Sequence, residues 1–353
     1  MSLLELGGWP AVLSALMQGH DLPSSHTHAA MAELLAGNAT SAQIAGFVVA
    51  LRQKGETVDE LSGLVDAMLA AASLVTLAPE MHQRAIDIVG TGGDRSHSIN
   101  VSTISMFVLA GGGVPVVKHG NRAASSQCGA ADLLAELGVR IDLTPAEIVP
   151  CLEQAGFAFC LAPTFHPALR HAGPTRRELG VQTAFNILGP MANPARVRRL
   201  VIGLADPTMA ERMINVLARN GAEHVLVVHG DDGLDELTTT ATSQAWELRD
   251  GNIQHYSIDP TSLGLALVPA SALQGGAPAL NAKLAKAVLS GVTGPHRDII
   301  LLNAAAGFLV AGVVSDLAAG MAMAATVIDD GRAIAALDRL LRVTSGLVTA
   351  RPA

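Results

Sequence analysis

The first stretch of this chain that could do chemistry is a glycine-rich segment between two apolar runs. Ile86 to Val89 has the length and composition of a buried strand, and Ile104 to Ala110 has those of a helix. Between them the run from Gly90 to Asp94 reads Gly-Thr-Gly-Gly-Asp, and its glycines let main-chain amides approach a ligand unhindered. A glycine loop that leads into a helix N-terminus favours negative charge, so we predict an anion site here. The spacing is that of neither a P-loop nor a dinucleotide-binding loop.

A second polar cluster begins at Lys118, directly after the apolar run Val114 to Val117, for which we predict a strand. Lys118 offers a point charge to a phosphate, and Arg122 offers a planar guanidinium. Asn121, Ser125 and Ser126 add neutral donors. A solvated basic loop is the simpler explanation, but ligands of open α/β sheets bind beyond the carboxyl ends of strands, where this cluster is expected. The convergence of basic, amide and hydroxyl groups therefore favours a ligand site.

A pair of adjacent carboxylates, Asp235 and Glu236, follows the apolar run Val225 to Val228 and a glycine-rich turn. Two such residues on a loop are usually solvated charge. Beside a polyphosphate site they fit a different role, because Mg²⁺ is typically held by one or two carboxylates together with phosphate oxygens and water.

A fourth cluster contains His166, the adjacent Arg176 and Arg177, and the run Asn186 to Pro190, which reads Asn-Ile-Leu-Gly-Pro. Either arginine could bind a substrate carboxylate through two hydrogen bonds, although a basic helical face is an equally good explanation for each one alone. Neighbouring residues point to different sides of a helix, so at most one of the two should face a site.

The remaining pattern indicates which elements hold these clusters. Apolar residues recur at helical spacing from residue 1 to about 72. From Ile86 onwards short strands alternate with helices, as in α/β domains with a mainly parallel sheet, and the two runs around Asp250-Gly251 predict a hairpin at its edge. We therefore predict an α/β protein with a small all-helical domain, residues 1–75, which later helices can rejoin. The larger α/β domain, residues 76–353, has a mainly parallel central sheet.

Composition excludes several classes of function. The chain has 353 residues, of which 50% are hydrophobic and 15% charged, and its net charge is −8. An acidic chain does not offer a general surface for nucleic acid or an anionic membrane. Three cysteines without a Cys-x-x-Cys spacing suggest neither a disulfide framework nor a thiolate zinc site. These features predict a cytoplasmic protein that acts on small molecules, with no nucleic-acid or membrane partner.

Taken together and in order, the four motifs are specific. Gly-Thr-Gly-Gly-Asp, Lys-His-Gly-Asn-Arg, Asn-x-Leu-Gly-Pro and Gly-x-Asp-Glu resemble those of the anthranilate-using members of the nucleoside phosphorylase and phosphoribosyltransferase family. The matching stretches are Asp87–Thr103, Lys118–Gly138, Ala162–Pro194 and Val227–Leu237, with a weaker likeness over nearly the whole chain. The resemblance implies an all-helical domain beside an α/β domain, in a homodimer.

The resemblance also implies a reaction, the transfer of a pentosyl group. Phosphoribosyl pyrophosphate (PRPP) loses pyrophosphate, and the amine of anthranilate takes its place on the ribose, giving N-(5-phosphoribosyl)anthranilate in an early step of tryptophan biosynthesis. Two Mg²⁺ ions per active site assist, and no single catalytic residue is implied, because the enzyme positions its substrates. An aromatic amine is already nucleophilic when neutral, which agrees with the absence of a strong base. The negative charge that develops on pyrophosphate would be stabilised by Mg²⁺ and Lys118.

The roles that the resemblance implies fall into three groups. The residues that would bind PRPP are Gly90, Gly92, Gly93, Asp94, Ser98, Asn100, Ser102, Thr103, Lys118 and Ala130. Those around anthranilate would be Gly90, His119, Asn121, His166, Arg176 and Gly189, and those that hold Mg²⁺ would be Ser102, Asp235 and Glu236. Two positions depart from the family pattern. Residues 95–98 are Arg-Ser-His-Ser in place of a small-residue loop, and Ala130 stands where a serine is common, so a contact there must come from the main chain.

Two alternatives share the fold. A pyrimidine nucleoside phosphorylase would have a glycine loop and a lysine, but the Lys-His-Gly-Asn-Arg and Asp-Glu motifs argue against it. A catalytically inactive relative that binds nucleic acid should be basic and should lack the acidic pair, whereas this chain is acidic and has Asp235 and Glu236. Closure of the two domains would suit the transfer reaction, and Gly111 to Gly113 is a candidate flexible point for it.

Overall fold

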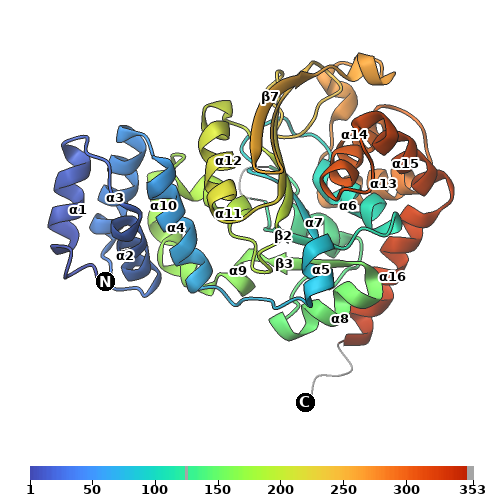
Figure 1. The fold of residues 1–353 in the computed structure, drawn as a ribbon. Coiled ribbons are helices and arrows are strands. Elements are labelled where there is room, and N and C mark those ends of the chain that lie inside the picture. The colour runs from blue at the N-terminus through green and yellow to red at the C-terminus, as the bar shows by residue number, and fades with distance from the viewer. Residues whose placement is uncertain (124–125, 348–353) are drawn as a thin grey trace.

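The computed structural model describes residues 1–123 and 126–347, and it begins with a bundle of four helices (Figure 1). The apolar residues of the third helix, Ile44, Phe47, Val48 and Leu51, are buried on one face, as their spacing predicts. The four helices are α1 Gly8–Met17, α2 Ser24–Leu35, α3 Ser41–Lys54 and α4 Val58–Ala70.

Helices α3 and α4 begin at capping boxes. Thr57 accepts a hydrogen bond from the Glu60 amide, and the Glu60 side chain accepts one from the amide of Thr57. Thr40 and Gln43 form the same reciprocal pair at the start of α3. Because these caps satisfy amides that a helix leaves unpaired, they fix where each helix begins.

A twisted sheet forms the centre of the second domain. Within the described residues it has seven strands in the order β3-β2-β1-β4-β5-β6-β7. The first five in this order pair in parallel, and β5, β6 and β7 pair antiparallel, so the predicted hairpin does lie at an edge. Asp250 and Gly251 both have positive φ, as a two-residue hairpin turn requires. The strands are β1 Ile86–Gly90, β2 Val116–Gly120, β3 Phe157–Leu161, β4 Arg199–Gly203, β5 His224–Gly230, β6 Ser243–Arg249 and β7 Asn252–Ile258.

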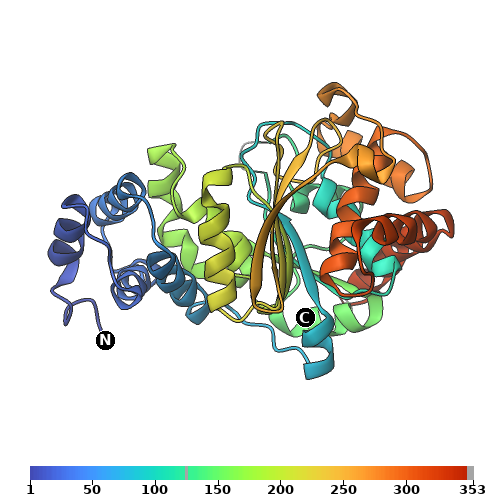
Figure 2. The same cartoon turned by 45° about the horizontal axis from the view of Figure 1, so that its top comes forward.

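Helices cover both faces of this sheet (Figure 2). On one side α6 and α14 pack on the parallel strands, with α15 and α16 behind them, and on the other side α12 packs on β5 and β6. Helix α12 also contacts α4, which joins the two domains. The covering elements are α5 Pro79–Arg84, α6 Val101–Gly111, α7 Ala130–Glu136, α8 Pro145–Ala155, α12 Ala210–Arg219, α13 Pro278–Leu289, α14 Pro295–Val310, α15 Leu317–Asp329 and α16 Arg332–Gly346, with short 3-10 turns η2 Pro207–Met209, η3 Pro260–Leu263 and η4 Ala270–Leu273.

After β3 the chain returns to the helical domain (Figure 1). The returning elements are α9 Ala162–Phe165, the 3-10 turn η1 Pro167–His171, α10 Gly173–Leu179 and α11 Phe185–Met191. Helix α10 packs on α3, and η1 packs on α2 so closely that a Cβ on Gly37 would lie 2.8 Å from the His171 ring. Residues 73–78, which lead from α4 to α5, have neither helix nor strand.

One predicted boundary is wrong. The strand expected over Val114 to Val117 runs from Val116 to Gly120, so Lys118 and His119 lie inside it. Its pairing with β3 continues through Lys118 opposite Phe159 and His119 opposite Cys160, and both polar residues are buried. Sheet pairing outweighs the polar character of the two residues, which had suggested a loop.

The predicted flexible point from Gly111 to Gly113 is instead a packed corner at the end of α6. A Cβ on Gly111 would lie 2.7 Å from the Arg332 carbonyl oxygen, and one on Gly112 would lie 2.5 Å from the Phe308 ring. These glycines allow α14 and α16 to pack closely on α6, which gives them a structural role.

Candidate active site

Lys118 is the centre of the polar cluster at the carboxyl ends of β1 and β2. Its side chain is only 1% exposed. The ammonium donates to the Ile88 carbonyl oxygen and, over 3.3 Å, to Ser102 Oγ on α6. Burial lowers the pKa of Lys118, and the nearby carboxylates of Asp87, Glu236 and Asp235 oppose this effect. The site therefore holds a desolvated cation among acidic groups.

The predicted acidic pair lies directly beside this lysine. Asp235 Oδ2 accepts the main-chain N–H of Gly92 at 2.6 Å, and Glu236 Oε1 accepts the main-chain N–H of Ser102 at 3.1 Å. Burial raises the pKa of Glu236 to about 7, and burial together with the charge of Glu236 and of Asp94 raises the pKa of Asp235 well above its usual range. Two buried carboxylates this close together repel each other, and a divalent cation between them would offset that cost.

The oxygen-rich donor set fits Mg²⁺. Carboxylates and a hydroxyl are hard ligands, and Ser102 Oγ lies near the acidic pair through its contact with Lys118. Within residues 1–123 and 126–347, no group of three or more His, Cys, Asp or Glu is placed to hold a metal ion. An ion bound here would complete its coordination with phosphate oxygens and water, as Mg²⁺ usually does.

A pair of glycines makes room for this acidic loop at the sheet edge. Gly90 at the end of β1 is paired directly with Gly203 at the end of β4. A Cβ on Gly203 would lie 1.6 Å from the main-chain oxygen of Asp235, and one on Gly90 would lie 2.5 Å from its carboxylate. The loop with Asp235 can cross the sheet at this height only because both positions lack a side chain.

The glycine loop has an unusual main chain. Gly92 and Gly93 have φ of 70° and 88°, and Arg95 and His97, which are not glycine, have φ of 58° and 55°. The loop amides already have acceptors: the Gly92 amide donates to Asp235, the Ser96 amide to Asp94, and the Ser98 amide to Ser96 Oγ. The amide of Gly275 donates to the His97 carbonyl at 2.9 Å, so a distant segment holds the loop in place.

Most of the other residues predicted to bind PRPP line the same region. Asn100, immediately before α6, donates to the Cys128 carbonyl at 2.8 Å and accepts from Asn281 at 2.8 Å. Ser98 pairs with Gln274 in an isolated bridge. The structure places Thr103 in the first turn of α6, where it is buried, and Ala130 at the first position of α7.

Arg122 is paired with a carboxylate in this structure. Its guanidinium donates to Asp132 at 2.8 Å on the surface, and the other Asp132 oxygen accepts from the amides of Ala123 and Gly129. Asn121 accepts from the amide of Arg122 at 2.8 Å. Ser125 lies outside the described residues.

The residues expected around anthranilate form a second group next to Lys118. His119 Nδ1 lies 3.0 Å from the carbonyl oxygen of Gly189, and its ring lies 5.0 Å from that of His166. Since a carbonyl only accepts, Nδ1 carries the proton. Nε2 of His119 is buried and has no hydrogen-bond partner among the described residues. Burial lowers the pKa of His119 to about 3, so the ring is neutral. A Cβ on Gly189 would meet nothing within 4 Å, which leaves open space beside it.

The two adjacent arginines separate as predicted. Arg176 on α10 is half-buried, and its guanidinium lies 4.9 Å from the centre of the Phe185 ring on α11, whereas Arg177 is exposed. Burial lowers the pKa of Arg176. A partly desolvated guanidinium held against an aromatic ring is well suited to bind a carboxylate.

Two buried polar residues at this site were not among the predicted ones. Asp87 lies in β1 and Asn193 lies in the segment between α11 and β4, and their side chains are hydrogen-bonded at 2.8 Å. A charged residue inside the apolar run Ile86 to Val89 was an available signal for Asp87. Asn193 carried no comparable signal.

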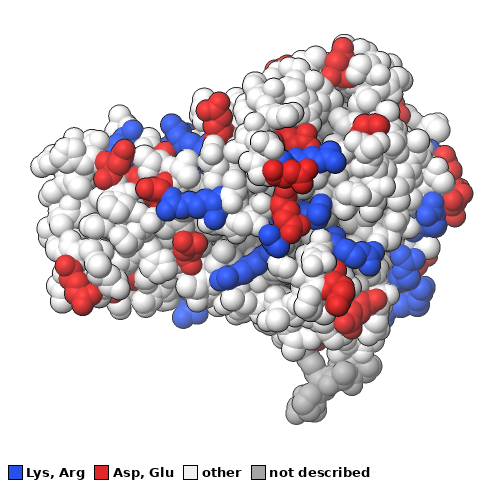
Figure 3. All heavy atoms as spheres, viewed as in Figure 1, with Lys and Arg blue, Asp and Glu red and all other residues white. Residues whose placement is uncertain are grey.

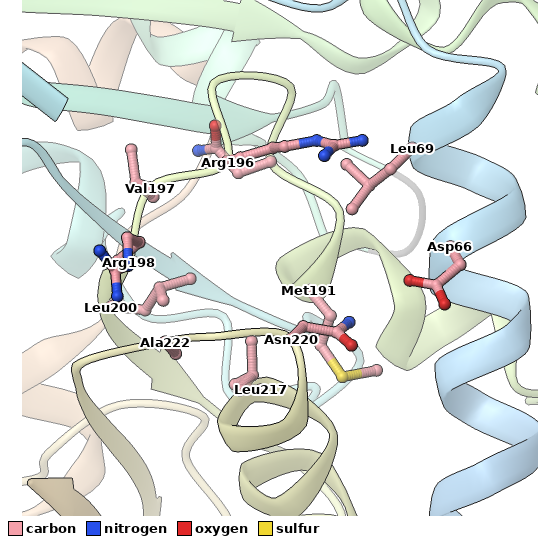
Figure 4. A pocket seen from close by; sticks show the side chains of 11 residues that line it. Asp66, Leu69, Met191, Arg196, Val197, Arg198, Leu200, Leu217, Asn220 and Ala222 are labelled. Carbon is pink, nitrogen blue, oxygen red and sulfur yellow. The ribbon is translucent and has the colours of Figure 1, made fainter. Parts of the chain in front are cut away.

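A separate cavity of about 310 Å³ lies between the domains, away from the glycine loop (Figure 4). Asp66 and Leu69 from α4 form one side, and Arg196, Leu217 and Asn220 are among the residues of the other (Figure 4). Its lining shares Asn193 with the site described above. This cavity therefore marks the junction of the domains behind the site.

The surface and the helices bear on the class of partner. Figure 3 shows acidic and basic side chains interspersed along a band down the middle of one face. Among the helices of the described residues, none is both long and apolar enough to span a bilayer.

Comparison with known families agrees with the fold and the site. The model described as "Glycosyl transferase family, a/b domain" matches residues 82–334, and the one described as "Glycosyl transferase family, helical bundle domain" matches residues 10–72. A helical bundle joined to an α/β domain, with an anion loop at the sheet edge, thus defines a glycosyl transferase of this class.

Individual relatives narrow the class. A protein of Nocardioides sp. named anthranilate phosphoribosyltransferase is 50% identical over 342 residues, which cover 96% of this chain and 99% of the relative. The crystal structure of anthranilate phosphoribosyltransferase from Thermus thermophilus superposes with a TM-score of 0.89 at 40% identity, over 95% of this chain and 99% of that one. The Saccharomyces cerevisiae enzyme in complex with PRPP and Mg gives 0.87 at 26% identity, over 96% and 98%. The chain belongs to the anthranilate phosphoribosyltransferase family.

Proposed function

We propose that this chain transfers the phosphoribosyl group of PRPP to the amine of anthranilate and releases pyrophosphate. The observation that carries the proposal is the convergence of Lys118, Ser102 and the acidic pair Asp235 and Glu236 beside the amide of Gly92. A cation, a hydroxyl, two carboxylates and main-chain amides are the groups that a Mg²⁺-bound polyphosphate needs. Membership of the family supports the choice of both substrates.

On the donor side, the glycine loop and the start of α6 hold PRPP. We assign this role to Gly90, Gly92, Gly93, Asp94, Ser98, Asn100, Ser102, Thr103, Lys118 and the main chain at Ala130. Ser102, Asp235 and Glu236 hold two Mg²⁺ ions. The structure of the yeast relative is a complex with PRPP and Mg, which supports a metal-bound donor.

On the acceptor side, the carboxyl ends of β1 and β2 and the elements that return to the helical domain hold anthranilate. Gly90, His119, Asn121, His166, Arg176 and Gly189 surround it in our proposal. Arg176 binds its carboxylate, because it is the half-buried one of the two adjacent arginines. A second structure of the yeast relative is a complex with 4-fluoroanthranilate, which supports an acceptor site in this fold.

The reaction then follows from position and charge. The amine lone pair forms the new C–N bond at the ribose anomeric carbon while the C–O bond breaks, and the electron pair of that C–O bond leaves with pyrophosphate. The nitrogen, positively charged once the C–N bond has formed, then gives up one proton to the released pyrophosphate or to water. Bound Mg²⁺ would supply positive charge to the leaving group. Lys118 adds a cation that is already desolvated, which makes it more effective than one in water. The neutral ring of His119 adds no positive charge to the acceptor side, and the two domains bring the reacting atoms together.

We also propose a homodimer, for which the helical domain offers a surface. Leu4, Met17 and Val49 are apolar side chains with 84%, 81% and 43% of their surface exposed, and all three belong to the first three helices or the turn before them. Exposed apolar side chains gathered in one region are typical of an interface. Sedimentation analysis tests this, and a single species at the monomer mass of 36.2 kDa would contradict it. Cytoplasmic location is proposed because all three cysteines are free thiols.

The decisive experiment is an assay with both substrates. Anthranilate is fluorescent, and its signal should fall when purified protein is mixed with PRPP and Mg²⁺. Pyrophosphate should appear in equal amount. No loss of anthranilate, together with phosphate-dependent cleavage of thymidine or uridine, would replace the proposal with a nucleoside phosphorylase.

A further inference from the structure

The segment from Gly189 to Ala195, which comprises the end of α11 and the residues that follow it toward β4, is hydrogen-bonded on both sides. The Gly189 carbonyl accepts from His119 at 3.0 Å, and the Ala192 carbonyl lies 2.8 Å from His166 Nε2. The Pro194 carbonyl accepts from the amide of Val75, in the linker after α4, at 3.0 Å. The segment thus connects the histidines of the acceptor side to the junction of the two domains.

One side chain of this segment reaches into the sheet. Asn193 is 3% exposed, and its amide group donates to Asp87 Oδ2 and to the carbonyl oxygen of Val117, each at 2.8 Å. Its carbonyl oxygen accepts from the amide of Ala195 at 2.9 Å. Asn193 therefore joins strands β1 and β2 to the segment that carries Gly189.

The partner of Asn193 is equally constrained. Asp87 is fully buried, and its Oδ2 also accepts from the amide of His119 over 3.3 Å. Its Oδ1 has no partner among the described residues. Asn193 is thus the side-chain donor to the buried carboxylate of Asp87, which also accepts the amide hydrogen of His119. Loss of that donor leaves the carboxylate with main-chain hydrogen bonds only.

From this arrangement we infer that Asn193 is a positioning residue for the acceptor substrate. It holds Gly189 and His119 in register by pinning the 189–195 segment to the strand that bears His119. The inference rests on the proposed function, because it concerns the anthranilate side of that site.

The same contacts predict which substrate is affected. The donor-side groups, Gly92, Ser102 and the acidic pair, are bonded to one another and not to the 189–195 segment in any contact of the described residues. A shift of the segment should move Gly189 and leave these groups in place. The expected result is a selective change in the KM for anthranilate.

The test uses Asn193→Asp, which keeps the shape and replaces the amide donor with a second carboxyl group beside Asp87. We expect the KM for anthranilate to rise about tenfold to hundredfold, with the KM for PRPP within about twofold, because a buried hydrogen bond to a charged group is lost. Asn220→Asp is the matched control, since Asn220 lines the same interdomain cavity but is exposed. The exchange variant Asp87→Asn with Asn193→Asp restores a donor and an acceptor across the pair and should recover part of the loss.

The possible results distinguish a failure of this inference from a failure of the proposed function. Equal effects on both KM values, or no effect in a folded variant, would overturn the inference. If Asn193→Asp does not fold, Asn193→Ala removes the donor and leaves the charge of Asp87 beside Lys118 in place, and the same selective rise is required of it. A wild-type protein that does not consume anthranilate would count against the proposed function instead. In that case the unfolding free energies of the two single variants and the exchange variant still test the contact between Asp87 and Asn193. If the changes in the two single variants add up to the change in the exchange variant, the two side chains do not interact and the inference is overturned.

Discussion

Asp235 holds the amide of Gly92 at 2.6 Å, so a carboxylate occupies the donor that a phosphate oxygen would otherwise take. Glu236 holds the amide of Ser102 in the same way. The two acidic residues therefore act on the anion loop as internal anions. If PRPP and Mg²⁺ bind as proposed, we expect the two carboxylates to release the amides and bind the metal, and the freed amides to bind phosphate oxygens. Donor and metal should bind together for this reason.

The first prediction concerns the metal. Activity should vanish in excess EDTA and return with Mg²⁺, and Glu236→Gln should lower kcat strongly in a protein that still melts cooperatively. The neighbouring Asp231→Asn is the control, since Asp231 is bonded to Thr242 and Gln244 outside the site. Full turnover in EDTA would show that the acidic pair serves another purpose.

The second prediction concerns the glycine loop. Gly92 has φ of 70°, which a β-branched residue resists, so Gly92→Val should abolish PRPP binding measured by calorimetry. Gly221→Val is matched to it, because Gly221 also has positive φ, of 83°, with nothing within 4 Å of a Cβ, but lies in the turn after α12. It should lose stability and keep its affinity for PRPP. Lys118→Ala should weaken PRPP binding most at low salt. Unchanged affinity in both site variants would refute the assignment.

The third prediction separates the two arginines. Arg176→Ala should raise the KM for anthranilate about tenfold to hundredfold, the equivalent of about 1.5–3 kcal/mol for a charge-assisted contact, and leave that for PRPP nearly unchanged. Arg177→Ala, one position away and exposed, should have little effect. Steady-state kinetics on both variants decide it, and an effect confined to Arg177→Ala would mean that α10 presents its other side.

The fourth prediction is a pH dependence of stability. Burial lowers the pKa of His119 from 6.5 to about 3. Between these values the unfolded chain binds a proton that the folded protein does not, so the contribution of His119 to stability falls as the pH drops below 6.5. From pH 7.5 to pH 5 the wild type should lose about 2 kcal/mol more than His119→Asn in denaturant unfolding. His20→Asn, in the turn after α1, controls for loss of an imidazole. Parallel losses in the wild type and His119→Asn would show that the ring is accessible to protons.

Local signals in the sequence predict the parts of the site that follow strand ends. The glycine loop and the acidic pair meet because the loops that follow parallel strands lie at the same edge of the sheet. A correct assignment of the strands is therefore enough to predict that these two loops lie close together. Lys118 is predicted from its charge, but its strand is misplaced, because two polar residues in succession look like a loop until pairing with β3 buries them. Arg122 resembles a phosphate ligand in sequence because nothing in its neighbourhood indicates the ion pair with Asp132.

Contacts between distant parts of the chain are beyond such signals. Asn193 meets Asp87 and Val117 across 106 and 76 positions of sequence, so no periodicity or spacing links them. The positive φ of Arg95 and His97 is likewise set by a distant strand-like contact, with the His97 carbonyl accepting from Gly275. The sequence therefore predicts which residues carry the chemistry better than it predicts which residues hold them.

The hydrogen bond between Val75 and Pro194 has a mechanical consequence. The chain connects the two domains at residues 73–78 and again near residue 194, and this hydrogen bond joins the two connections. A similar bond joins Ser73 to the Phe165 carbonyl, where the chain has just entered the returning helices. Two connections that are hydrogen-bonded to each other act as a single hinge axis. Any opening of the helical domain should then be a rotation about this line, which would change the distance between Arg176 on α10 and the carboxyl ends of the strands.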